Sequence, residues 1–270
     1  LYISSNPPLM TPPESLGSLS QLQSLYIYYN DALTSLPESL GSLSQLQSLE
    51  INDNDALTNL PESLGQLFQL QSLQIRGNSE LTTLPDLLGQ LSQLQSLYIF
   101  ENNDLIILPE SLKRLRSLEE LAVSKIEDLV PFGEVTPILT SLDTLAIINS
   151  KLADLPESLG QLTQLECLYI GSNSKLTTLP ESLGLLSQLQ SLTIYNNEAL
   201  LNLPKSLGSL SQLQSLEIHT NSNLTTLPES LTQLVNSLEE LDIRYNSIPN
   251  ETVQYWKTAL PNTQIISEYD

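Results

Sequence analysis

Two acidic and two basic side chains near the carboxyl end of the chain recur at a fixed spacing. Glu217 is followed 25 residues later by Asp242, and His219 is followed 25 residues later by Arg244. Paired carboxylates beside a histidine are the residue types of an acid–base or metal site. Arg244, however, supplies a positive partner for the carboxylates. We therefore favour a cross-strand cluster of ion pairs over a catalytic group, with catalysis as the alternative.

Cys167 and His219, the single cysteine and the single histidine, are the other reactive candidates. They lie two repeats apart, which is roughly 10 Å in a stacked sheet and too far for a Cys–His pair. The sequence also contains no glycine-rich phosphate loop, zinc spacing or calcium-loop motif. The NLT and NET sequons at Asn223 and Asn250 would matter only in a secretory setting. We predict no enzyme activity, no metal and no cofactor.

The spacing of these residues comes from a repeat that covers essentially the whole chain. Successive units read LQSLYIYYNDALTSLPESLGSLSQ and LQSLEINDNDALTNLPESLGQLFQ. Repeat positions are counted from the first leucine, and positions 4 and 6 form the period-two apolar pair of a short strand. Stacked about 4.8 Å apart, such turns form a parallel sheet over a continuous leucine core. The units start at Leu22, Leu46, Leu70, Leu94, Leu118, Leu142, Leu165, Leu189, Leu213 and Leu238.

Two further repeat positions hold the same residue type in most turns, and we call each such stacked set a column. Both columns have a structural interpretation. Asparagine at position 9 can satisfy backbone groups where each strand bends away, because an amide both donates and accepts. The return segment LPESLGSL places an acid after proline, where it faces the positive end of a short helix. The asparagines are Asn6, Asn30, Asn54, Asn78, Asn102, Asn173, Asn197, Asn221 and Asn246. The acids are Glu14, Glu38, Glu62, Asp86, Glu110, Glu157, Glu181 and Glu229, with Lys205 as the exception.

The form LxxLxIxxNxxLTxLPESLG resembles the leucine-rich-repeat superfamily. It is similar to the repeats of Ras-group plant proteins, of many bacterial proteins and of plant nucleotide-binding immune receptors, although no nucleotide-binding segment is present. The resemblance implies an α/β fold, a curved horseshoe solenoid. Its parallel sheet would lie on the concave face and short helices or 3-10 turns on the convex face. It also implies protein–protein recognition through the concave face.

We expect one solenoid over residues 1–270, with a partial first repeat at 1–21 and an irregular repeat at 118–141. Leu1 aligns with position 4, so we predict that upstream sequence or another molecule covers this end. The irregular repeat loses the asparagine to Ile126, and Pro131 and Pro137 rearrange its return segment. We favour a degenerate repeat that changes the local curvature over a hinge or a convex-side contact.

A closing cap is expected at about 247–270. Asn250 can cap a helix, and the segment LPNTQII supplies a last strand. Trp256 is predicted to plug the core rather than to contact a ligand. The apolar face of the helix consists of Val253, Trp256, Ala259 and Leu260.

Alternation along each strand leaves positions 3, 5 and 7 on the concave face, with position 8 at its rim. Eight of the ten tyrosines fall at positions 5, 7 and 8. Tyrosine is enriched at interfaces, although it also favours strands in general. The first predicted binding patch is Tyr26, Tyr28, Tyr29, Glu50, Asp53, Arg76, Tyr98, Phe100 and Glu101. The second is Tyr169, Tyr195, Glu217, His219, Asp242, Arg244 and Tyr245, and the irregular turn separates the two.

The chain carries 31 acidic and 10 basic side chains, a formal charge of −21. Such a polyanion argues against nucleic acid or an acidic membrane as partner. The single cysteine favours a reducing compartment such as the cytoplasm, with a secreted bacterial effector or a cell-surface protein left open. We predict a protein-binding scaffold of unknown partner. The alternatives are the substrate-recognition arm of a larger enzyme or effector and a surface or adhesion array.

Overall fold

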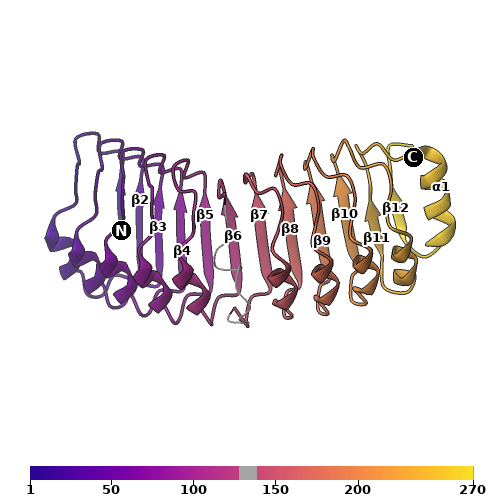
Figure 1. Ribbon diagram of the computed structural model, residues 1–270. Helices are drawn as coiled ribbons and strands as arrows, with labels where there is room; N and C mark the ends of the chain where they lie inside the picture. The colour runs from indigo at the N-terminus through magenta and orange to yellow at the C-terminus, as the bar shows by residue number, and fades with distance from the viewer. Residues whose placement is uncertain (128–138, 270) are drawn as a thin grey trace. The chain divides into compact units, whose positions relative to one another are not determined.

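The structure, a computed structural model, describes residues 1–127 and 139–269, which form two compact units. Unit 1 spans Leu1–Leu142 and unit 2 spans Asp143–Asp270. Figure 1 colours unit 1 from indigo to magenta and unit 2 from there to yellow. The single solenoid over residues 1–270 stays a prediction, and Pro131 and Pro137 lie outside the described residues.

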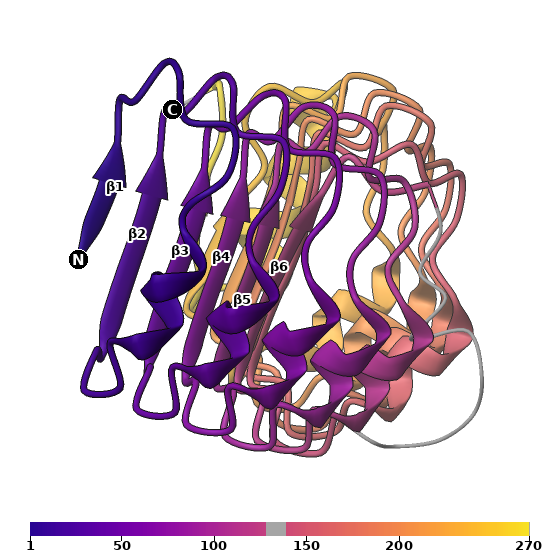
Figure 2. The same cartoon turned by 90° about the vertical axis from the view of Figure 1, so that its left-hand side faces the viewer.

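Unit 1 contains a sheet of parallel strands, one from each turn, which Figure 2 shows side by side. Each strand pairs with the next in register, so that Leu25 lies opposite Leu49 and Leu49 opposite Leu73. This register is the one that the repeat predicts. The strands are β1 (Tyr2–Ser4), β2 (Ser24–Tyr28), β3 (Ser48–Asn52), β4 (Ser72–Arg76), β5 (Ser96–Phe100) and β6 (Glu120–Ser124).

Unit 2 has the same arrangement. Its strands also pair in parallel and in register, and Cys167, Ser191 and Ser215 occupy equivalent places on three neighbouring strands. The strands are β7 (Thr144–Ile148), β8 (Cys167–Gly171), β9 (Ser191–Tyr195), β10 (Ser215–His219), β11 (Glu240–Asp242) and β12 (Gln264–Ile266). The last strand confirms the expectation for the segment LPNTQII.

Among the described residues, nine return segments form short 3-10 helices on the side of their unit away from the strands (Figures 1 and 2). A proline in extended conformation precedes every one, such as Pro37 with φ −71° and ψ 147°. The helices are η1 (Glu14–Ser18), η2 (Glu38–Ser42), η3 (Glu62–Gln66), η4 (Asp86–Gln90) and η5 (Glu110–Arg114) in unit 1. Unit 2 has η7 (Glu157–Gln161), η8 (Glu181–Leu185), η9 (Lys205–Ser209) and η10 (Glu229–Leu234).

Leucine and isoleucine fill the space between strands and 3-10 helices. In the complete turns, the residues at positions 4 and 6, such as Leu49 and Ile51, are at most 2% exposed. Burial of an apolar side chain of this size stabilises a fold by about 1.5–3 kcal/mol. Ile126, which replaces the asparagine of the irregular turn, is also fully buried. The predicted leucine core is confirmed in both units.

The asparagine column is buried and continuous over β2 to β5. The side-chain oxygen of Asn54 accepts the backbone N–H of Asn30 at 3.2 Å, and its amide nitrogen donates to the carbonyls of Ile27 and Asn52, both at 3.0 Å. Asn78 repeats the pattern one turn later. Each amide therefore ties its own turn to the preceding one and satisfies groups that would otherwise be buried without partners.

Position 8 has a left-handed backbone in every described turn, a feature that the sequence analysis missed. Tyr29 and Asp53 both have φ of 54°, and glycine occurs there only at Gly77, with φ of 65°. The N–H of Tyr29 donates to the carbonyl of Asn52 in the next turn at 3.2 Å. Since this conformation is costly for residues with a side chain, the stacked neighbour must hold it in place. It directs the following asparagine inward.

The acidic column binds the neighbouring turn rather than only its own helix. The carboxylate of Glu38 accepts the N–H of Ser63 at 3.3 Å, and that of Glu181 accepts the N–H of Ser206 at 2.9 Å. This backbone hydrogen bond lowers the pKa of Glu181. The acids lie at the starts of the 3-10 helices, as predicted. The backbone N–H groups that they accept, however, belong to the next helix in the stack.

The carboxyl-terminal cap is the α-helix α1 (Asn250–Ala259) followed by β12. The predicted capping role of Asn250 is wrong, because Pro249 occupies the cap position and Asn250 instead accepts a hydrogen bond from Gln254 at 3.2 Å. Trp256 is 1% exposed, as expected of a core plug. Val253 and Leu260 are buried with it, and Ala259 is half-buried. No helix among the described residues is long and apolar enough to cross a membrane.

Replacing Asn54 with alanine tests the asparagine column. The N–H of Asn30 and the carbonyl of Ile27 would lose their partners, and an unpaired buried group costs about 1–3 kcal/mol. We expect urea denaturation to show a loss of that size in the free energy of unfolding. Asn59→Ala, at an exposed asparagine, is the matched control and should leave the value unchanged. Equal effects of the two substitutions would contradict the structural role of the column.

Candidate binding surface

The side chains at positions 3, 5 and 7 point away from the core in each unit, and we call the surface that they form the open sheet face. Most of them are half-buried, as the pattern of β2 illustrates: Ser24, Tyr26 and Tyr28 are partly exposed while Leu25 and Ile27 are covered. Most of the members of the two predicted patches lie on this face. The first patch falls within unit 1 and the second within unit 2.

Four tyrosines cluster at the start of unit 1. The rings of Tyr2 and Tyr26 stack with their centroids 4.6 Å apart, Tyr28 lies 6.0 Å from Tyr26, and Tyr29 lies 6.3 Å from Tyr28. Tyr29 is 60% exposed. A further aromatic pair, Tyr98 and Phe100, stacks at 6.3 Å on β5. The face therefore presents large aromatic surface already held by ring-to-ring contact.

Two of these tyrosines donate their hydroxyl to a carboxylate on the following strand. Tyr28 on β2 bonds to Glu50 on β3, and Tyr98 on β5 bonds to Glu120 on β6. Burial and the neighbouring carboxylate raise the pKa of both phenols, Tyr28 the more strongly. Both tyrosines are therefore anchored in position at neutral pH.

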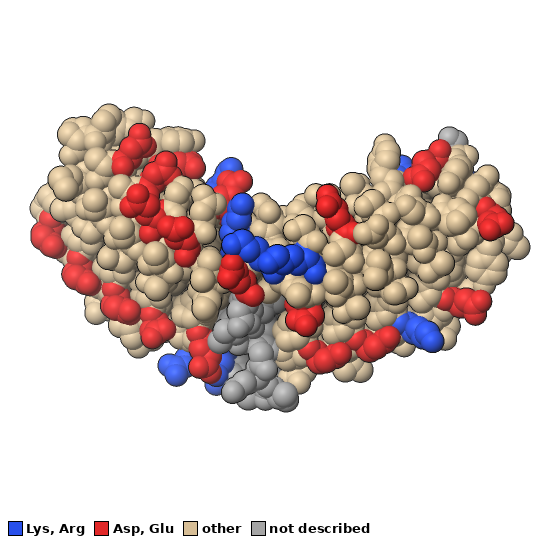
Figure 3. Space-filling model, turned by 45° about the horizontal axis from the view of Figure 1, so that its top comes forward, with Lys and Arg blue, Asp and Glu red and all other residues tan. Residues whose placement is uncertain are grey.

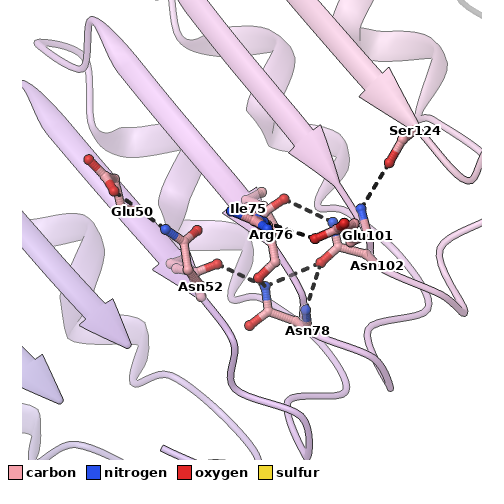
Figure 4. A network of polar contacts seen from close by, with 9 residues as sticks. Glu50, Asn52, Ile75, Arg76, Asn78, Glu101, Asn102 and Ser124 are labelled. Atoms are coloured by element: carbon pink, nitrogen blue, oxygen red, sulfur yellow. Dashed lines mark hydrogen bonds and ion pairs between the residues drawn. The ribbon is translucent and has the colours of Figure 1, made fainter. Parts of the chain in front are cut away.

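Position 7 is Asn52 on β3 and Arg76 on β4 (Figure 4). Arg76 turns toward the end of β5, where its Nε donates to Glu101 at 2.9 Å between two half-exposed side chains. Asn52 donates to Glu50 at 3.4 Å and is 8% exposed. Its side-chain oxygen is buried without a hydrogen-bond partner. Asn52 was absent from the predicted patch, because a polar residue at one surface position carries no signal of its own.

In unit 2 the rings at position 7 lie along the sheet. Gly171 leaves the space into which Tyr195 folds, since a Cβ on Gly171 would stand 2.1 Å from the Tyr195 ring. His219 stacks on the other side of Tyr195, with the centroids 5.7 Å apart. Burial raises the pKa of Tyr195. The absence of a side chain at residue 171 was the only sequence signal for this arrangement.

Arg244 and Asp242 form an ion pair within one turn of unit 2. Arg244 binds Asp242 through Nε at 3.0 and 3.1 Å and through Nη2 at 2.6 Å, and its backbone N–H donates to the same carboxylate at 3.0 Å. The predicted cluster is confirmed in part: Arg244 forms its ion pair with Asp242 of its own turn, whereas Glu217, the register partner of Asp242, adds only an electrostatic attraction to Arg244 from the neighbouring strand. Burial alone would raise the pKa of Asp242, but the bonds from Arg244 outweigh it and lower the pKa.

Of the remaining candidates, Cys167 and Tyr169 lie two residues apart on β8 and interact through their side chains. Cys167 on β8 is a half-buried free thiol, and burial raises its pKa, which disfavours the thiolate. Within the part of the chain that the structure describes, no group of three or more His, Cys, Asp or Glu residues is placed to hold a metal ion. At the rim, Tyr245 is 65% exposed, and its N–H donates to Glu268 at 2.6 Å.

The Arg244–Asp242 pair predicts a pH-dependent loss of stability in Arg244→Gln. A carboxyl with a lowered pKa stabilises the fold above its unfolded pKa of about 3.9, and this contribution disappears as the pH falls. Arg244→Gln should therefore reduce the free energy of unfolding at pH 7, because it leaves the carboxylate of Asp242, which is 5% exposed, without its charged partner. The deficit should shrink below about pH 4.

Arg76→Gln is the control for this experiment, because it breaks an exposed pair that contributes about 0–1 kcal/mol. Chemical denaturation of both variants between pH 3 and pH 7 measures the effect. A deficit in Arg244→Gln that is the same at every pH would show that the carboxylate of Asp242 is not its source.

Comparison with known proteins agrees with this geometry. A family model described as a leucine-rich repeat region matches residues 37–132 and 133–267, and a second leucine-rich-repeat model matches residues 1–55. The chain belongs to the leucine-rich-repeat family. Leucine-rich-repeat domains generally serve as protein–protein interaction scaffolds. No curated protein sequence matches this leucine-rich-repeat chain.

Several solved structures have the same fold. The leucine-rich-repeat domain of the type III effector XopL matches 100% of this chain and 76% of its own, with a TM-score of 0.63 and 25% identity. An internalin of Listeria monocytogenes, InlF, matches 94% of this chain and 76% of its own, with a TM-score of 0.69 and 21% identity. A TDR receptor matches 92% of this chain and 43% of its own, with a TM-score of 0.62 and 24% identity.

Proposed function

We propose that this leucine-rich-repeat chain is a non-enzymatic scaffold that binds a protein partner through the open sheet face. The observation that carries the proposal is the distribution of variable residues. Outside the irregular repeat and the turn after it, the leucines, asparagines and return segments scarcely change, whereas positions 5, 7 and 8 differ and hold most of the tyrosines. Tyrosine and arginine are the residues that dominate protein interfaces.

The geometry of the face supports the same proposal. Its aromatic rings are held by stacking and by hydrogen bonds to neighbouring strands, so that little side-chain entropy remains to be lost on binding. Such a preorganised surface is suited to binding a macromolecule. It is less suited to catalysis, because the open face does not exclude water. The partner of such an acidic chain is proposed to be a protein rather than nucleic acid or an acidic membrane.

A second candidate function is the recognition arm of a larger effector. The similarity to the leucine-rich-repeat domain of a type III effector, which extends over this entire chain, favours it. In this case the same face would select a substrate for an activity located elsewhere in the protein. The complete reading frame distinguishes the two candidates: a catalytic domain supports the second, and a frame that contains only repeats supports the first.

Site-specific photocrosslinking tests the proposed face. p-Benzoylphenylalanine replaces Phe100 on the open sheet face or, as the matched control, Phe68, an exposed aromatic residue outside it. In extracts of the source cell we expect ultraviolet light to join a discrete polypeptide to the protein labelled at position 100 but not to the protein labelled at position 68. Gel shift and mass spectrometry measure the adducts. A partner captured only from position 68 would contradict binding through this face.

A further inference from the structure

We infer that the open sheet face of unit 1 contains a subsite for a lysine or arginine side chain of the protein partner, formed by Tyr28, Glu50 and Asn52. The inference rests on the proposed function and adds the chemistry of the partner to it. The three residues lie on two adjacent strands, with Tyr28 of β2 directly opposite Asn52 of β3 and Glu50 two residues before Asn52. They therefore form one compact group.

The side-chain oxygen of Asn52 lacks a hydrogen-bond partner. The side chain is 8% exposed, its amide nitrogen donates to Glu50 at 3.4 Å, and its oxygen accepts no hydrogen bond. A buried acceptor without a donor destabilises the free protein. A ligand that brings an N–H group to this oxygen would remove that penalty.

The carboxylate of Glu50 has acceptor positions left for a ligand. It accepts hydrogen bonds from the hydroxyl of Tyr28 and the amide of Asn52, whereas a carboxylate offers about four lone-pair sites. None of the ion pairs found among the described residues includes Glu50. The nearby cation on β4, Arg76, is engaged with Glu101 instead. Glu50 therefore has free acceptor positions and no cationic partner among the described residues.

Charge and aromatic surface surround the group. Tyr26, Tyr28 and Tyr29 lie in one contact cluster, and the face of a tyrosine ring attracts a cation placed over it. Figure 3 shows acidic side chains gathered over this end of unit 1. An ammonium or guanidinium group matches every feature: it donates to two acceptors, neutralises the carboxylate and packs against rings.

Glu120 provides a matched control within the same face. It also accepts a hydrogen bond from a tyrosine on the preceding strand, Tyr98. No unpartnered amide oxygen accompanies it, because the position 7 residue of its strand is Ser124, whose hydroxyl accepts the N–H of Glu101 at 2.9 Å. Removing the charge of Glu120 therefore changes the net charge as Glu50→Gln does, without touching the proposed subsite.

The experiment selects random dodecapeptides on phage against the immobilised full chain and against its Glu50→Gln and Glu120→Gln variants. Glutamine keeps the size of the side chain and an acceptor for the Tyr28 hydroxyl. We expect enrichment of lysine or arginine with the wild-type protein and with Glu120→Gln, and loss of that enrichment with Glu50→Gln. Thermal unfolding midpoints equal to the wild type confirm that each variant is folded.

The best peptide is then synthesised, and its affinity is measured by fluorescence anisotropy. Loss of a charged hydrogen bond should weaken binding about tenfold to a hundredfold in Glu50→Gln. Binding to Glu120→Gln should change less than about twofold, as expected of a single distant charge under screening. If Glu50→Gln unfolds, Asn52→Ala provides the second variant and should weaken binding several-fold. A norleucine peptide should no longer distinguish wild type from Glu50→Gln.

Two results would overturn the inference, and they differ in what they say of the proposed function. In the first result, Ser72→Trp on the open sheet face abolishes peptide binding, but Glu50→Gln and Glu120→Gln weaken it equally. This result would contradict the subsite and still support binding through the face. In the second result, peptides bind Ser72→Trp as tightly as the wild type, which means that they bind outside the open sheet face. This result would contradict both the subsite and binding through the face.

Discussion

The structure depends on the buried asparagine column, because these amides hold successive turns in register. A side chain such as Asn54 satisfies backbone groups of two turns at once, and its place is set by the left-handed residue before it. A strand slipped by one residue would turn leucines to solvent and surface residues inward. Correct register therefore determines which side chains reach the open sheet face.

This division of roles frees positions 5, 7 and 8 for recognition while the remainder of each turn maintains the fold. The freedom is partial. Tyr28 and Tyr98 donate to carboxylates on neighbouring strands, and Arg244 is fixed by Asp242. The surface residues are consequently ordered before a partner arrives, which lowers the entropic cost of binding. Their charge is also organised: Arg76 is drawn to Glu101, whereas Glu50 is left without an ion pair among the described residues.

The sequence was sufficient to predict the features that recur along the chain. Strands, leucine core and asparagine column follow from periodicity, and the burial of Trp256 follows from its place on the apolar face of the cap helix. It was insufficient where a contact depends on the conformation of the adjacent turn. Three contacts were not predictable for this reason: the pairing of Arg244 with Asp242 rather than with Glu217, the hydrogen bond that Glu38 accepts from Ser63, and the packing of Tyr195 over Gly171. The unpartnered oxygen of Asn52 likewise emerges only from the packed neighbours.

Disulfide formation between engineered cysteines tests the register of the stack most directly. In a Cys167→Ser background, Ser48→Cys with Ser72→Cys joins register partners on β3 and β4. Strand spacing of about 4.8 Å lies within the Cα separation that a disulfide accepts. We predict rapid oxidation without loss of the folded state, and slow or absent oxidation when Ser48→Cys is combined with Gln74→Cys. Preferential bonding of the offset pair would contradict the proposed stacking and the open sheet face built on it.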